Sequence, residues 1–205
     1  GIGYGGAIIC LRHLAANLDR TRYEPWIVTG RDGPEYATIA ADANWRCIKD
    51  RHLDLTPWRR RLADAPRTSV QRLFQLAGRQ LVSRADDLIN FLPFFLGLLA
   101  LALRLRPAVI HANNEPICNR AALIVARILG IPSVCHVRDP LGGDYHSRWI
   151  YSLPAHYVPV SRWVQQRLAQ LGVPTGICTV TYDGIPLESL NVNADGEPFR
   201  VRHGI

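Results

Sequence analysis

The feature that most constrains the fold is a repeated pattern in the second half of the chain. From Pro107 onward, short apolar runs alternate with helical or loop segments, and each run ends at polar residues. The runs are continuous, as expected for parallel strands covered on both faces. This alternation predicts an α/β fold with a Rossmann-like, doubly wound parallel sheet. The expected strands are 108–112, 132–137, 156–160 and 178–182, with a last apolar run at 199–205, and the expected helices are 115–129, 144–152 and 162–171.

The first half of the chain predicts similar but less regular elements. They are inferred from apolar periodicity and from the turn residues between the periodic segments. In order, they are a glycine loop over 1–6, a helix over 7–18, a strand over 24–29, a helix over 35–42 that starts after Pro34, a strand over 45–49, a basic loop over 57–67 and a helix over 69–84.

Phe91–Leu103 is the most apolar stretch of the chain. As a helix rising about 1.5 Å per residue, it would be about 20 Å long. A bilayer core is about 30 Å thick, so this stretch is too short to span it. We therefore expect a buried helix packed against the parallel sheet.

The net charge of +7 is carried by arginine, because Lys49 is the only lysine. Guanidinium groups suit phosphate or anionic lipid, although arginine-rich composition is an equally simple explanation. Arg60, Arg72 and Arg79 are candidate membrane-surface residues, each worth about 1 kcal/mol near an anionic bilayer. A solvated helix face is the alternative. Nucleic acid is not an expected partner, because no aromatic side chains interleave the basic ones.

The five cysteines are widely spaced and include no C-x-x-C pair. Neither a zinc site nor a redox motif is therefore indicated. Free thiols fit a reducing compartment, and no signal peptide is visible, although the chain begins at Gly1 rather than at Met. We expect a cytoplasmic protein, with the inner face of the plasma membrane as a second location.

The glycine loop is the first candidate site. Gly1, Gly3 and Gly6 match G-x-G-x-x-G, in which glycines let an anion approach backbone amides at a helix N-terminus. A dinucleotide fold also needs a preceding strand and an acidic residue ending the next one. The next strand ends Val28-Thr29-Gly30-Arg31, with Asp32 late, so a dehydrogenase is disfavoured, although Arg31 could meet a 2′-phosphate. A tight strand-to-helix turn is the alternative interpretation.

Two strand ends supply the other candidates, since open α/β sheets bind ligands at the carboxyl ends of their strands. His111 and Asn113 end one strand, and His136, Arg138 and Asp139 end the next. Arg138 could clamp an anionic group, and Asp139 could act as a base or orient a hydroxyl. The alternatives are a core histidine at 111, a helix cap at Asn113 and a structural Arg138–Asp139 pair.

The order of these segments and their sequence motifs resemble the N-terminal half of a two-domain GT-B glycosyltransferase of group 1, family 4. Gly5-Gly6-Ala7 resembles the family's GGA segment, and Ser161 its VS segment. Asp183-Gly184-Ile185 resembles the NGI/V-D turn, with Asp183 in place of the usual Asn. Many relatives have H-x-H where this chain has His111-Ala112-Asn113. An amide can bond a sugar hydroxyl but cannot act as a base.

The resemblance implies an enzyme that transfers a sugar from a nucleotide-sugar donor to a glycan or lipid-linked acceptor, with retention of configuration. Residues 1–190 would be the acceptor-side domain, with its first strand upstream of Gly1. Residues 191–205 would lead to a donor-binding domain, without which the chain would be inactive. No metal is expected, and no cofactor, because the nucleotide-sugar is a substrate. The implied catalytic residues are Asn113 and Asp139, and the implied acceptor- or phosphate-binding residues are Gly5, Gly6, His111, His136 and Arg138.

Two other classes remain open. One is a nucleotide-sugar epimerase of GT-B fold. The other is a non-enzymatic module that binds a carbohydrate or lipid-linked acceptor.

Overall fold

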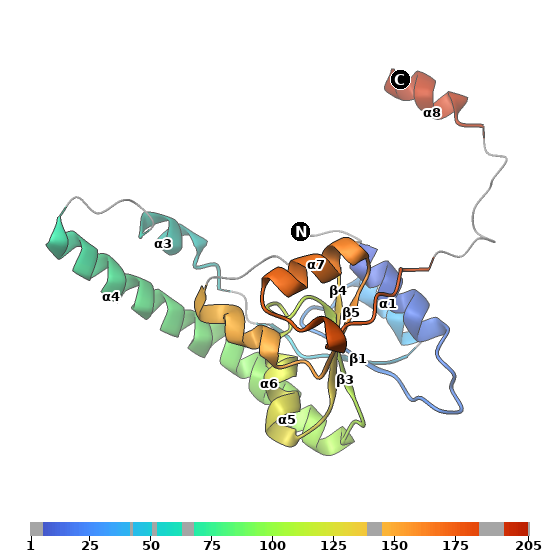
Figure 1. Ribbon diagram of the computed structural model, residues 1–205, viewed down its shortest axis with the longest axis horizontal. Coiled ribbons are helices and arrows are strands. Elements are labelled where there is room, and N and C mark those ends of the chain that lie inside the picture. The colour runs from blue at the N-terminus through green and yellow to red at the C-terminus, as the bar shows by residue number, and fades with distance from the viewer. Residues whose placement is uncertain are drawn as a thin grey trace.

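The computed structural model describes residues 6–41, 43–50, 53–62, 68–138, 145–184 and 195–204. Strands lie at the centre of the molecule and helices surround them (Figure 1). The predicted α/β class with parallel pairing is confirmed. The helices are α1 (Gly6–Ala16), α2 (Pro34–Ala37), η1 (Thr38–Ala41), α3 (Thr56–Arg61), α4 (Ser69–Asp86), η2 (Asp87–Phe91), α5 (Leu92–Leu105), α6 (Arg120–Leu129), η3 (Tyr145–Ser152), α7 (Arg162–Gln170), η4 (Thr175–Ile177) and α8 (Glu197–His203).

The strands form two parallel sheets. β1 (Trp26–Thr29) pairs with β2 (Asn44–Cys47), and β3 (Ile110–Asn114), β4 (Ser133–Val137) and β5 (His156–Pro159) pair in that order. The expected strand over 178–182 is reduced to a bridge between Cys178 and Tyr157. Its pairing continues as two hydrogen bonds, from Thr179 N to Tyr157 O at 2.9 Å and from Thr181 N to Pro159 O at 3.0 Å.

The main core lies between the three-stranded sheet and the helices that follow its strands. Leu123 of α6, Tyr157 of β5 and Leu168 of α7 are fully buried in it. The Tyr157 hydroxyl donates to the carbonyl of Tyr151 at 2.7 Å, which satisfies its hydrogen-bonding group away from water. A smaller core of Ala15, Ile27 and Ile39 holds α1 and η1 against β1. These two clusters hold the helices against the strands.

Helix α7 begins and ends where its sequence predicts. The Ser161 hydroxyl accepts a hydrogen bond from the backbone N–H of Val164 at 3.2 Å, as an N-cap does. Gly172 has φ 92°, a left-handed conformation that glycine adopts without a side-chain clash.

Four local expectations were wrong. The basic loop over 57–67 is helical over its first part, as α3. Residues 199–203 of the last apolar run are helical and form α8 together with Glu197 and Pro198. The expected helix over 115–129 begins only at Arg120, because turns occupy 116–119. Strand β3 extends to Asn114, so Asn113 lies in the strand rather than after it.

The expectation of a buried helix over Phe91–Leu103 was also wrong. This stretch belongs to a continuous helix, Ser69–Leu105, made of α4, the π-helical turn η2 and α5. All residues of this helix are described, and only Ala102 is buried. The 37-residue helix is long and apolar enough, by length and composition alone, to cross a membrane. In Figure 1 its α4 part projects away from the strands.

The α5 part of this helix packs against the body at a glycine. A Cβ at Gly97 would lie 2.8 Å from Cγ2 of Ile48, just after β2. A Cβ at Gly78, in α4, would meet the end of the Leu62 side chain, at 2.9 Å from Cδ2 and 3.4 Å from Cδ1. The Ile48 methyl is fixed close to the backbone, whereas the Leu62 methyl ends a side chain that can rotate away.

We therefore expect Gly97→Ala to lower the free energy of unfolding by about 1–3 kcal/mol, as overpacking does. The matched change Gly78→Ala should stay within about 1 kcal/mol of the parent, because better helix propensity offsets the movement of Leu62. Urea unfolding followed by circular dichroism measures both. Equal effects of the two changes would contradict the close packing of α5 on the β2 side.

Candidate functional site

The carboxyl ends of β3 and β4 lie side by side. Their parallel register pairs Asn113 with His136 and Asn114 with Val137. Arg138 follows β4 directly, and its backbone N–H donates to the carbonyl of Asn114 at 3.0 Å. Asn114 has φ 100°, a region that few non-glycine residues adopt and in which asparagine is enriched. The polar residues of both strand ends are therefore gathered at one edge.

Arg138 is the centre of a hydrogen-bonded cluster. Its Nε and Nη2 donate to the two carboxylate oxygens of Asp183, each at 3.0 Å, and Nη1 donates to Oδ1 of Asn113. The Arg138 side chain is 12% exposed and that of Asp183 is 29% exposed. A bidentate pair shielded to this degree fixes the guanidinium plane. We call Asn113, Arg138 and Asp183 the strand-end cluster.

Asn113 connects this cluster to the first turn of α1. Its Nδ2 donates to the carbonyl of Ala7 at 3.2 Å. The amide therefore does not cap the next helix, which begins after Asn119. Gly6 lies next to Ala7, and a Cβ at Gly6 would meet no described atom within 4 Å. The space beside this turn is open, so Gly6 is not required for packing within the described residues.

Two histidines lie beside the cluster. The rings of His111 and His136 stack with centroids 5.7 Å apart and planes 10° from parallel. Nε2 of His136 is buried, has no hydrogen-bond partner among the described residues, and lies 3.7 Å from Oδ1 of Asp183. That separation is too long for a hydrogen bond, although a charge on the ring would still be attracted.

Burial and the Arg138 charge lower the pKa of His136, against an opposing effect of Asp183. Burial at the crowded strand ends is the main cause that lowers the pKa of His111. The charges of His136 and Arg138 nearby lower it further. His111 nevertheless keeps an exposed face. We therefore expect solvent to make its shift smaller than that of an enclosed ring. Both rings are neutral at pH 7, so each can donate one hydrogen bond to a ligand and accept another from it.

These shifts predict a loss of stability in mild acid. In the unfolded chain the histidines titrate near about pH 6.5. Because their folded pKa values are lower, the unfolded chain takes up protons first as pH falls, and the folded state loses relative stability. We expect a lower urea midpoint at about pH 5.5 than at about pH 7.5, and a smaller difference in the variant His111→Gln/His136→Gln. His156→Gln is the matched control, and an undiminished pH difference in the double variant would contradict this assignment.

The structure brings four of the predicted site residues together: His111, Asn113, His136 and Arg138. Gly6 lies beside them through Ala7. Gly5 and Asp139 lie outside the described residues, so their predicted roles stay predictions. Arg60, Arg72 and Arg79 lie on α3 and α4 and are exposed.

Sequence reasoning missed two members of the site. Asp183 was interpreted only as a turn residue, yet it pairs with Arg138. Cys10, on α1, has its pKa raised by burial and by the Asp183 carboxylate, to which its thiol hydrogen-bonds. The one available signal was that Asp183 replaces the asparagine usual in the resembled motif.

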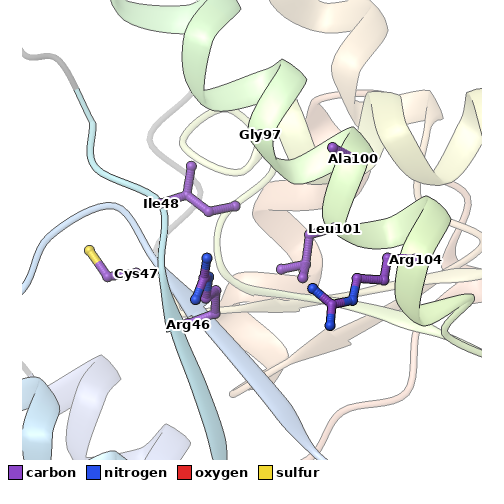
Figure 2. A pocket seen from close by; sticks show the side chains of 7 residues that line it. All are labelled: Arg46, Cys47, Ile48, Gly97, Ala100, Leu101 and Arg104. Carbon is purple, nitrogen blue, oxygen red and sulfur yellow. The ribbon is translucent and has the colours of Figure 1, made fainter.

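A separate hollow of about 380 Å³ lies between the β2 segment and α5. Figure 2 shows Arg46 and Arg104 reaching into it from the two sides, with Leu101 on its wall. It does not include the strand-end cluster. In the described parts of the chain, no three His, Cys, Asp or Glu side chains are grouped closely enough to hold a metal ion.

Solved structures place this fold in the GT-B class of glycosyltransferases. Anabaena HepE in complex with UDP and glucose superposes with a TM-score of 0.61 at 15% sequence identity, covering 100% of this chain and 48% of HepE. HepE with UDP (TM-score 0.60) and with UDP-glucose (0.61) match with the same identity and coverage. This chain thus spans about half the length of those proteins, and the likeness establishes the fold alone.

The family follows from the sequence itself. The model of Glycosyltransferase Family 4 matches residues 4–189, which is most of the chain. This chain belongs to that family, and the predicted relationship to family 4 of GT-B fold is confirmed. No curated protein sequence matches it significantly. The chain is therefore a glycosyltransferase domain equivalent to an N-terminal half.

Proposed function

We propose that this domain forms the acceptor side of an enzyme that transfers a sugar from a nucleotide-sugar donor to a glycan or lipid-linked acceptor, with retention of configuration. The family membership supports glycosyl transfer, and the HepE structures, solved with UDP and UDP-glucose, make a nucleotide-sugar the donor to test first. In this proposal, a second domain binds most of the donor, and the site described above receives the acceptor in the cytoplasm.

The observation that carries the proposal is the strand-end cluster beside the first turn of α1. Asp183 and Asn113 together engage three N–H groups of Arg138 and fix its plane, and the Cys10 side chain also hydrogen-bonds this guanidinium. Because Asp183 balances the Arg138 charge, the pair suits a neutral sugar hydroxyl better than a free phosphate. The neutral histidines add donors and acceptors of the same kind.

The proposed role of this side is to orient the acceptor hydroxyl rather than to remove its proton. Asn113 is an amide that lies where many relatives have a second histidine, and it has no basic nitrogen. Its Oδ1 and Nδ2 are engaged by Arg138 and the Ala7 carbonyl. A retaining transfer, in which little base catalysis is needed from the acceptor side, fits these residues. Asp139 remains the proposed candidate for a base.

The test uses the intact natural protein and UDP-, GDP- and ADP-sugars, each with and without a mixture of glycan and lipid-linked acceptors. Release of the nucleotide that depends on acceptor would support the proposal. Interconversion of donors without transfer would instead identify an epimerase. Binding of acceptor with no donor turnover would identify a non-enzymatic module. A product with inverted anomeric configuration would overturn retention while leaving transfer intact.

A further inference from the structure

The hollow between the β2 segment and α5 is a concave space that the proposed acceptor site does not use. Its volume of about 380 Å³ falls within the range of about 300–1,000 Å³ that is usual for small-molecule pockets. Residues two apart in an extended strand point to the same face, so Arg46 and Ile48 share a face of the β2 segment. Because Gly97 of α5 packs on Ile48, this face is the one that α5 covers.

The α5 wall of the hollow is mainly apolar. Gly97, Ala100, Leu101 and Arg104 line it, and their spacing of three and four residues places them on one side of the helix. Gly97 and Ala100 have small side groups, which leaves room beside the Leu101 side chain. Together with Ile48 across the hollow, these residues offer an apolar surface to the body of a ligand.

Two guanidinium groups meet this apolar surface. Arg46 from the strand and Arg104 from the helix reach into the hollow from its two sides (Figure 2). None of the described residues that line it is acidic, and neither arginine has an ion pair or a side-chain hydrogen bond within the described ranges. The negative end of the helix dipole favours a cation at Arg104, in the last turn of α5, but it does not account for Arg46. The two like charges repel, and an anion between them would remove that repulsion.

Two carboxylates of the same small sheet are engaged elsewhere. The Glu24 carboxylate accepts hydrogen bonds from Nε1 of Trp26 at 3.2 Å and from Nδ2 of Asn44 at 3.0 Å. Asp32 pairs with Lys49 at 3.3 Å. Neither carboxylate lines the hollow, so the counter-ion for its arginines has to come from a ligand.

We infer that the hollow binds a phosphate monoester, with the phosphate between Arg46 and Arg104 and the apolar part against Leu101 and Ile48. A phosphate monoester carries about −1.5 to −2 charges near pH 7, so it balances two guanidinium groups better than a single carboxylate does. Its terminal oxygens can accept hydrogen bonds from both guanidinium forks. The inference does not depend on the proposed acceptor chemistry, because the strand-end cluster is not part of the hollow.

The test is isothermal titration calorimetry of the intact protein with 1-naphthyl phosphate, a monoester with an apolar body. We expect saturable binding that weakens in about 0.5 M salt. The variant Arg46→Gln/Arg104→Gln should bind at least about tenfold more weakly, since it loses charge-assisted hydrogen bonds. Arg72→Gln/Arg127→Gln is the matched control, because it removes the same charge elsewhere and should bind like the parent. All four arginines are exposed, so both variants should keep the parent circular dichroism spectrum and urea midpoint.

Two partial ligands separate the charged contacts from the apolar ones. Inorganic phosphate and 1-naphthol should each bind at least about tenfold more weakly than the ester, because each makes only one set of contacts. A charge placed in the hollow tests the same point from the protein side. Ala100 is exposed on α5, so Ala100→Glu puts a carboxylate beside the arginines and should weaken ester binding more than the size-matched change Ala100→Gln.

Hydrogen–deuterium exchange followed by mass spectrometry locates the bound ester, since the intact protein has a separate donor site in the proposed function. We expect slower exchange at 46–48 and 97–104, and unchanged exchange at 111–114. Absence of ester binding, equal weakening by the two arginine variants, or protection confined to other segments would overturn the inference. So would binding of inorganic phosphate or 1-naphthol as tight as that of the ester. The proposed glycosyl transfer would survive any of these results.

Discussion

Replacing Arg138 with alanine is expected to lower kcat/KM for the acceptor by about 100-fold, the size of loss that a misplaced site produces. Arg138 joins β4 to Asp183 and Asn113 at the edge of the strands. Without it, the Asp183 carboxylate loses its counter-ion and Asn113 loses a donor. The measurement is steady-state kinetics of the intact protein with the acceptor varied.

The same change should cost stability, because Asp183 would be left partly buried without its partner. We expect a loss of about 2 kcal/mol, below the range for fully buried pairs because Asp183 is 29% exposed. Arg138→Lys should restore little, since an ammonium group cannot form the bidentate contact. The matched control is Arg127→Ala on the exposed surface of α6. Parent-like acceptor kinetics in Arg138→Ala would remove Arg138 from the site.

Leu123→Ala is expected to lower the free energy of unfolding by about 2–5 kcal/mol. Leu123 of α6 is fully buried and packs in the core beneath β3, β4 and β5. Truncation would leave a cavity there, and the strand ends that hold the site depend on this packing. The measurement is urea unfolding of the protein monitored by circular dichroism.

The matched control is Leu81→Ala, because Leu81 is 71% exposed on α4. That change should alter the free energy of unfolding by less than about 0.5 kcal/mol, as surface substitutions usually do. If both leucines cost the same free energy, Leu81 is covered by another part of the protein.

Most of the site could be predicted because one rule of parallel sheets applies to it. Polar residues that follow neighbouring parallel strands meet at one edge, and this rule grouped His111, Asn113, His136 and Arg138. Asp183 could not be found this way. It lies 45 residues after Arg138 in a segment that forms only a bridge to the sheet, and no local pattern shows which strand end such a segment reaches.

The exposure of the long helix is a property that the sequence could not predict. Periodicity correctly indicated that residues 69–84 have an apolar side, and composition correctly marked Phe91–Leu103 as strongly apolar. Neither property reports what covers an apolar side chain. The expectation of burial failed because α5 packs against the body along one side only, at Gly97, and leaves most of its side chains partly covered. Only the docking of Leu53 and Leu62 along another side revealed which face stays open.

The sequence by itself determined the α/β class, the parallel pairing, the family and the strand ends that carry the site. These follow from local periodicity and from motif order, which are properties of neighbouring residues. The tertiary structure alone decided that Asp183 neutralises Arg138, that Asn113 connects the cluster to α1, and that the longest helix is exposed. Each of these depends on contacts between segments distant in the chain, and such contacts form only when the whole domain packs.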